Sequence, residues 1–141
     1  MQTFLPYDDY GASMACLDNV RLGNQVYREG VTLLCGGWPN HPASKMWVGY
    51  ERSLALYCFR GAQEMVARKG TKYSWKDEVC IKWLRYFQDA IASLTDTGRP
   101  PWLGNPDIHA SHRSNLLKKN PSHYAQFGWQ EPDDLAYVWP V

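Results

Sequence analysis

The sequence predicts an all-α protein that folds as one compact domain over residues 1–141. Long segments carry apolar residues at helical spacing, and glycine or proline clusters separate these segments. No domain linker, internal repeat or low-complexity tract divides the chain. Hydrophobic residues form 45% of the sequence, and a chain of this length buries roughly 68–70% of its unfolded surface, so it can build a core unaided. We expect three main helices, a shorter C-terminal helix and an irregular aromatic tail.

The first helix is predicted over residues 9–34, ending at Gly36-Gly37. Candidate N-terminal caps for this helix are Asp8, Asp9 and Ser13. Its apolar positions fit a helical period only loosely, and Gly23 and Gly30 weaken it further. Because glycine removes side-chain bulk, we expect close packing against another backbone at these two positions.

Two further long helices follow. The second is predicted from Pro42 to about Arg68, because proline is favoured in a first helical turn and Lys69-Gly70 supplies a stop. The third is predicted to open at Ser74 and to run to about residue 95. Ser74 with a carboxylate three residues later resembles a capping box.

A fourth, shorter helix is predicted from Ile108 to Lys119. Asn105-Pro106-Asp107 can start it, and Pro121 forces it to stop. The tail from Tyr124 to Val141 is rich in aromatic rings, so we expect it to dock onto the helices.

Composition restricts the classes of function. The net charge is +1 and the pI is near 7.7, so an anionic partner must be met by a local basic patch rather than by a polybasic tail. Neither a signal peptide nor a run of 18 apolar residues is visible, which predicts a cytoplasmic protein without a membrane partner. The four cysteines, spaced without a CxxC pair, predict reduced, buried thiols rather than disulfides or zinc ligands. We expect no metal and no cofactor.

A first group of polar residues lies within the first predicted helix. Arg21, Gln25 and Arg28 recur at helical spacing and share one face, and Glu29 lies four residues beyond Gln25. Arginines can bind phosphates through two hydrogen bonds, and a carboxylate between them can stabilise a cation or act as a base. The alternative is a solvated helix face with intrahelical ion pairs.

A second group occupies the stretch GGWPNHPASKMWVGYE, residues 36–51. Polar edges beside aromatic rings suit the recognition of a nucleobase and stacking on it. The candidate residues of this group are Asn40, His41, Lys45 and Trp47. The alternative is a rigid aromatic turn between helices.

A third group lies in the fourth predicted helix. Its side chains all donate hydrogen bonds to phosphate oxygens, and its members are His109, His112, Arg113, Lys118 and Lys119. His109 and His112 are three residues apart, a spacing that could hold a metal, but no third ligand is nearby in the sequence. We expect a phosphate-contacting face, with a solvated face as the alternative.

These groups, in this order, resemble the pyrimidine-dimer DNA glycosylase family, the phage-type endonuclease V group with its bacterial and viral relatives. The segments that carry the resemblance are MQTFLPY at the start, LDNVRLGNQ at 17–25, WPNHPASKMWVGYE at 38–51, PPWLGNPDIHASHRSNLLKKNPSHY at 100–124 and PDDLAYVWP near the end. The resemblance implies an all-helical enzyme that flips a nucleotide out of duplex DNA, removes a damaged pyrimidine and nicks the strand.

The resemblance also implies site residues. The nucleophile would be the N-terminal α-amine, here of Met1, which attacks the sugar C1′ to form a Schiff base. An α-amine has a pKa of about 7.7–8.0, so a useful fraction is unprotonated near neutral pH. Tyr27-Arg28-Glu29 is similar to the family's Tyr-Arg-Glu, which makes Glu29 the expected carboxylate and Arg28 its catalytic neighbour. Arg21 and Arg28 would hold the flanking phosphates.

The expected function is therefore a DNA glycosylase with AP-lyase activity on damaged or modified pyrimidines in duplex DNA, in the cytoplasm of a bacterium or a phage-infected host. The alternative is a non-catalytic protein of the same fold that binds nucleic acid or a small nucleotide. The near-neutral charge favours this alternative, as does Gln2, whose size predicts that Met1 is retained.

Overall fold

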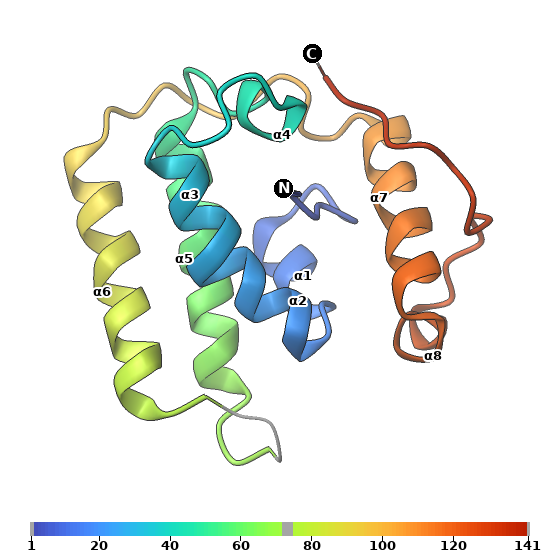
Figure 1. The fold of residues 1–141 in the computed structure, drawn as a ribbon, viewed down its shortest axis with the longest axis horizontal. Helices are drawn as coiled ribbons and strands as arrows, with labels where there is room; N and C mark the ends of the chain where they lie inside the picture. The colour runs from blue at the N-terminus through green and yellow to red at the C-terminus, as the bar shows by residue number, and fades with distance from the viewer. Residues whose placement is uncertain (1, 72–74, 141) are drawn as a thin grey trace.

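The computed structural model describes residues 2–71 and 75–140 and forms one all-helical unit (Figure 1). Within these residues every regular element is a helix. The longer ones are α5 (Glu51–Ala67), α6 (Asp77–Ser93) and α7 (Pro106–Lys119). The shorter ones are α1 (Tyr10–Ala15), α2 (Asn19–Asn24), the π-helix η1 (Gln25–Gly30), α3 (Val31–Leu34), α4 (Pro42–Lys45), α8 (Pro121–Tyr124) and the 3-10 helix η2 (Ala125–Phe127). The all-α prediction is confirmed.

The first predicted helix is divided in two, which corrects the range 9–34. Asp9 caps α1 by accepting a hydrogen bond from the Ala12 N–H. The chain then turns at Cys16, and Asp18 adopts an extended conformation, with ψ of 159°. The Asp18 carboxylate accepts a hydrogen bond from the Tyr124 hydroxyl instead of capping α2. The helix is therefore interrupted between α1 and α2 by a tertiary contact, at residues 16–18, where the sequence contains no glycine or proline that would predict an end.

Residues 19–34 form one continuous rod of α2, η1 and α3, because the junctions at Gln25 and Gly30 keep helical dihedrals. A π-turn widens the helix and often occurs at functional sites. Gly30 lies against α5 so closely that an added Cβ would be 2.4 Å from the Cys58 sulfur and 2.6 Å from the Gln25 carbonyl oxygen. Gly30 is closely packed as expected, but against the Cys58 side chain rather than against another backbone, and an added Cβ at Gly23 would meet the Tyr27 side chain of the same rod.

The second predicted helix is also interrupted. After α4 the chain turns at Gly49, whose φ of +84° suits glycine, and α5 begins at Glu51. In Figure 1, α5 runs through the middle of the molecule, with α1 and the α2–α3 rod on one side and α6 on the other. The third predicted helix corresponds to α6, whose N-cap Lys76 makes no side-chain capping bond. Ser74 of the expected capping box lies outside the described residues.

The fourth predicted helix is confirmed as α7 (Pro106–Lys119), which begins two residues earlier than expected. The Asn105 side chain accepts from the Asp107 N–H and caps it, and Pro121 starts α8. The tail then runs back along α7 (Figure 1). Ser111 and Asn115 of α7 bond to the tail backbone at Val138 and Leu135, so the expected docking of the tail is confirmed.

The core lies between these helices and includes the start of the chain. Phe4 and Leu5 are buried beside residues such as Val26, Leu54 and Leu116. Cys16, Cys58 and Cys80 are buried free thiols, as predicted. Cys35 is exposed, which corrects the prediction for this cysteine, because it lies at the C-terminal end of α3, where the chain leaves the core.

Candidate functional site

The N-terminal segment is held by side chains from three helices. Gln25 of η1 donates from Nε2 to the Gln2 carbonyl at 3.0 Å and accepts from the Phe4 N–H at 3.2 Å. The Tyr57 hydroxyl lies 2.6 Å from the Phe4 carbonyl oxygen and 2.9 Å from Gln25 Oε1. The Gln25 amide therefore pairs with the main chain of residues 2 and 4 as a neighbouring strand would.

Gln25 and Trp47 thus hold the protein's own N-terminal segment rather than a surface. Gln25 is only 2% exposed, and Trp47, also 2% exposed, donates from its indole N–H to Thr3 Oγ1 at 3.2 Å. Their predicted direct contact with DNA is corrected: both side chains are sealed in the core, where their hydrogen bonds are used by Gln2, Thr3 and Phe4.

Two histidines of α7 hold the next residue. The Leu5 N–H donates to His112 Nδ1 at 2.8 Å, and the Leu5 carbonyl oxygen is 2.7 Å from His109 Nδ1. The Gly104 N–H donates to His109 Nε2, so Nδ1 of His109 carries the proton that bonds to Leu5. His112 instead accepts at Nδ1.

The burial of these rings fixes their charge. Burial, with a smaller contribution from His109, lowers the pKa of His112 to about 3. Burial also lowers the pKa of His109, more than its hydrogen bond to Leu5 raises it. Both rings are therefore neutral near pH 7, and their predicted role as phosphate donors is corrected to one of positioning the N-terminal segment.

Arg113 continues this support. Its guanidinium donates to the Pro6 carbonyl oxygen at 2.7 Å and forms an ion pair with Glu131 of the tail. It is half-buried. These two contacts give Arg113 a role in positioning the N-terminal segment, and its phosphate contact stays a prediction.

The predicted carboxylate lies on the rod next to the residue that holds the segment. Glu29 follows Gln25 by four residues, a spacing that places both on one side of a helix. Glu29 is half-buried and Arg28 is exposed. Within residues 2–71 and 75–140, the Glu29 carboxylate makes no ion pair or side-chain hydrogen bond. Met1, the expected nucleophile, falls outside the described residues, and Gln2, the first described residue, is bound through its carbonyl by Gln25 of the rod.

Three basic residues gather at one edge of the site. Arg21 of α2 is 3.2 Å from the Asp18 carboxylate. The pKa of Lys119 at the end of α7 is lowered by desolvation first, and then by the positive charges of Arg21 and Lys118. The structure therefore brings together cations that are almost a hundred residues apart in the sequence. An anion at this basic edge, defined here as Arg21, Lys118 and Lys119, would relieve their mutual repulsion.

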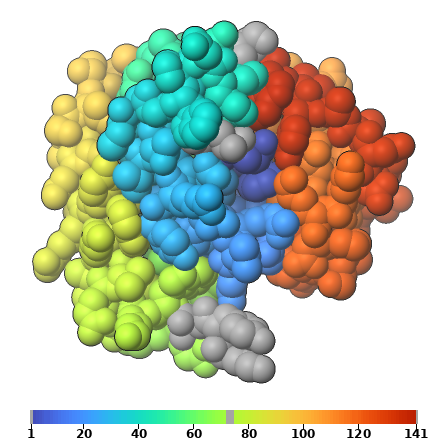
Figure 2. All heavy atoms as spheres, viewed as in Figure 1, coloured from blue at the N-terminus to red at the C-terminus, as the bar shows by residue number. Residues whose placement is uncertain are grey.

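The loop before α4 forms another border. His41 Nδ1 accepts from the Ala43 N–H and caps α4, and the His41 ring meets Trp139 of the tail edge-on at 5.8 Å. Asn40 and Lys45 are exposed on the same segment. In Figure 2, dark-blue atoms of the N-terminal segment are visible in a depression between the blue rod, the teal loop and the red tail. Rod, loop and tail thus surround the entry to the N-terminal segment.

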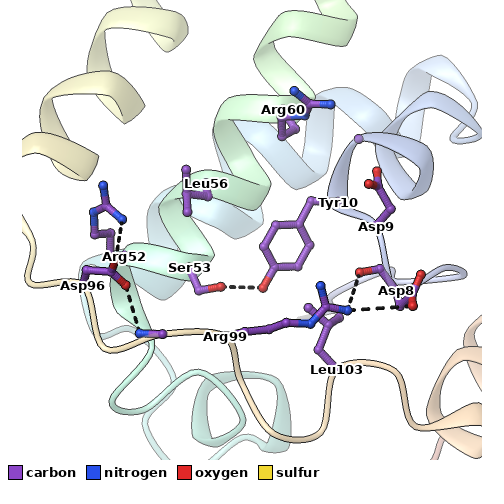
Figure 3. A pocket seen from close by; sticks show the side chains of 12 residues that line it. Asp8, Asp9, Tyr10, Arg52, Ser53, Leu56, Arg60, Asp96, Arg99 and Leu103 are labelled. Atoms are coloured by element: carbon purple, nitrogen blue, oxygen red, sulfur yellow. Dashed lines mark hydrogen bonds and ion pairs between the residues drawn. The ribbon is translucent and has the colours of Figure 1, made fainter.

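A separate hollow of about 500 Å³ lies between α1, α5 and the loop before α7 (Figure 3). Arg52 pairs with Asp96 at 3.4 Å, and Arg99 pairs with Asp8 at 3.8 Å, so most of its cations are already neutralised. The sequence did not single out these arginines, because their partners come from distant segments. None of the contacts that hold residues 2–5 involves this hollow.

Sequence reasoning missed Thr3 and Tyr57 as site residues. Nothing local in the sequence distinguishes a core tyrosine from one whose hydroxyl, like that of Tyr57, bonds to a distant backbone carbonyl. In the described part of the chain, no three histidine, cysteine or carboxylate side chains are grouped so as to hold a metal. No described helix is both long enough and apolar enough to cross a membrane.

Comparison with known proteins identifies the family. A family model described as pyrimidine dimer DNA glycosylase matches residues 1–79 of the 141. The match covers the N-terminal segment, the rod, α4 and α5, and it ends before α7. Comparisons with curated proteins and with solved structures gave no significant match. Since the family model covers more than half of the sequence, the chain belongs to the pyrimidine dimer DNA glycosylase family.

Proposed function

We propose that this protein removes a damaged pyrimidine from duplex DNA and then nicks the strand through a Schiff base on its N-terminal α-amine. The family supplies the general activity and a DNA substrate that contains pyrimidine dimers. One observation favours an amine mechanism: the backbone of residues 2–5 is fixed by His109 and His112 of α7 and by Gln25, which lies on the same rod as Glu29.

The chemistry requires the amine to be held near the sugar. The Met1 nitrogen would form a bond to C1′ while the bond from C1′ to the pyrimidine breaks and the base leaves with the electron pair. Loss of the amine proton and opening of the sugar ring give a cationic imine. A base then removes a C2′ proton, and the C3′–O bond to the 3′ phosphate breaks. Fixing the reactants in this geometry can supply several orders of magnitude in rate.

Glu29 is the residue proposed to assist both stages. Its carboxylate would stabilise the positive charge on the sugar and take up the C2′ proton in the elimination. It is half-buried, on the same rod as Gln25, which binds the N-terminal segment. A positioned acid or base of this kind contributes about 100-fold to 10,000-fold in rate.

The surrounding cations are proposed to hold the DNA backbone. Arg28 is exposed beside Glu29, and the basic edge lies at the end of α7. Phosphate contacts of this type fix the register of the protein on the duplex without reading its sequence. Asn40, His41 and Lys45 of the loop are proposed to face the extruded nucleotide.

The test is borohydride trapping on a duplex that contains an abasic site. The wild-type protein should become covalently linked to the DNA, and mass analysis of the linked peptide should identify Met1. Glu29→Gln should trap at least about 100-fold more slowly. Glu78→Gln is the matched control, because Glu78 is exposed in the first turn of α6, away from the site. Lys45→Gln removes an exposed amine of α4, and any trapping that this variant retains cannot come from Lys45.

Protein carrying an extra glycine before Met1 provides a second control, because it moves the amine and leaves the rest of the sequence unchanged. It should lose trapping while still binding the duplex. Equal trapping by the wild-type, extended and Glu29→Gln proteins would refute the mechanism. Binding of a lesion duplex with no trapping by any of them would instead assign this chain a non-catalytic, DNA-binding role.

A further inference from the structure

Trp38 combines two unusual properties. Its side chain is 66% exposed, and it is the one tryptophan among the described residues whose ring is largely exposed. Its backbone φ is +56°, and no other non-glycine residue in the described chain has a positive φ. The left-handed region is unfavourable for a bulky side chain, and such strain concentrates at functional sites.

The backbone around Trp38 is fixed on both sides. The Trp38 carbonyl oxygen accepts from the His41 N–H at 3.0 Å. The preceding Gly37 donates to the Thr32 carbonyl at 2.9 Å and accepts from the Ser44 hydroxyl at 2.9 Å. The ring is therefore presented to solvent by a braced turn, rather than by a loose loop that could fold it onto the core.

This turn borders the depression described above. His41, at the end of the turn, meets Trp139 of the tail, and Trp47, just beyond α4, binds Thr3 of the N-terminal segment. Figure 2 shows the teal loop beside the dark-blue N-terminal atoms. A duplex lying across the rod and the basic edge would meet this loop from outside.

We propose that the Trp38 ring stacks on a base left uncovered within the duplex when a nucleotide is flipped out of the helix at the lesion. Extruding a nucleotide unstacks its neighbours, and aromatic or apolar side chains commonly fill such gaps. The inference rests on the proposed function only in requiring a lesion site in duplex DNA. It adds a specific role for a residue outside the catalytic group.

Stacking explains why a strained tryptophan occupies this turn. Any base offers a π-face, so stacking tolerates every sequence around the lesion. Asparagine or glycine would adopt the positive φ with less strain but would offer no ring. The structure thus has an exposed aromatic ring where backbone preference alone would select a small residue.

The experiment uses a duplex that carries a tetrahydrofuran abasic analogue with 2-aminopurine as the neighbouring base. Tetrahydrofuran cannot form a Schiff base, so the result does not depend on Met1 or Glu29. Wild-type protein should quench 2-aminopurine on binding. Trp38→Asn should bind about tenfold more weakly, the loss expected for one stacked base, and should lose the quenching. Trp38→Phe keeps a ring and should retain most of the affinity and most of the quenching.

Val48→Asn is the matched control, because Val48 is 70% exposed in the turn after α4 and carries no ring. It should bind and quench like the wild type. Trp38→Asn should melt at or above the wild-type temperature, and Trp38→Gly provides a second ring-free variant that suits the turn. Wild-type affinity and quenching in either ring-free variant would overturn the proposal, as would an equal loss in Val48→Asn. Failure of borohydride trapping would leave this result unaffected.

Discussion

Acid should destabilise this protein through His112, because the ring must stay neutral to accept the Leu5 N–H. Burial lowers the native pKa of His112 to about 3, whereas an unfolded histidine has a pKa of about 6.5. Above the unfolded pKa neither state binds the proton, so the contribution is constant. Below it only the unfolded state binds the proton, so stability falls as the pH falls from about 6.5 towards 3.

The loss of stability per pH unit follows from one proton. A group that titrates only in the unfolded state lowers the free energy of unfolding by about 1.36 kcal/mol for each pH unit below its unfolded pKa. At pH 5, about 1.5 units below the unfolded pKa, the loss from His112 is therefore about 2 kcal/mol relative to pH 7.5. His109 shifts in the same direction and adds to the total. A small domain has only about 5–15 kcal/mol of stability, so the effect is large enough to measure.

The assay is urea unfolding at pH 7.5 and pH 5, followed by circular dichroism. His112→Asn keeps an acceptor near the Nδ1 position but cannot titrate. The variant should have a lower free energy of unfolding than the wild type, and this difference should shrink by about 2 kcal/mol between pH 7.5 and pH 5. Leu116→Ala, a core deletion on the same helix, should show the same deficit at both values. A deficit of His112→Asn that does not change with pH would refute the assignment of a neutral, accepting His112.

Three further predictions follow from the contacts of the rod and the basic edge. Gln25→Leu should lower the free energy of unfolding by about 3 kcal/mol, because it strips partners from Gln2 and Phe4, and urea unfolding checks this. Gly30→Ala should lower the free energy of unfolding by about 2 kcal/mol or more, because the added Cβ would meet the Cys58 sulfur and the Gln25 carbonyl. Gly23→Ala, where the added Cβ meets only the movable end of Tyr27, should cost less, and equal costs would contradict the packing argument. Lys119→Gln should reduce the slope of log affinity against log salt by about 1 on duplex DNA, whereas Lys82→Gln on α6 should leave the slope unchanged.

Most of the helices could be predicted from the sequence, because their signals are local. Asn105 before Pro106 and Pro121 after Lys119 bound α7 closely. The breaks at Cys16–Asp18 and before α5 were missed for different reasons. The Asp18 conformation depends on a bond to Tyr124, more than a hundred residues away, which no local pattern contains. Gly49 lies inside the second predicted helix, Pro42 to about Arg68, and its positive φ interrupts that helix.

The candidate site was predicted less completely, because residue type alone does not tell a ligand contact from a core contact. His109, His112, Arg113, Gln25 and Trp47 carry the polar groups that nucleic-acid contacts need, yet the structure uses those groups to bind the chain's own residues 2–6. The N-terminal segment has no sheet to pair with, so its buried N–H and C=O groups require side-chain partners. No local feature of the sequence separates these polar side chains from exposed ones, because their partners in residues 2–6 are distant along the chain.

The way the segment is held bears on the size of residue 2. Gln25 contacts the carbonyl of Gln2 and the N–H of Phe4, so the anchor acts on the main chain and not on the side chain at position 2. A bulky side chain there need not displace the backbone. Chain length before residue 2 matters more, since each added residue extends the chain by up to about 3.6 Å, comparable with the 3–3.5 Å separation needed for attack. The position of the amine therefore depends on how many residues precede Gln2, which is why a single added glycine discriminates between an amine mechanism and mere binding.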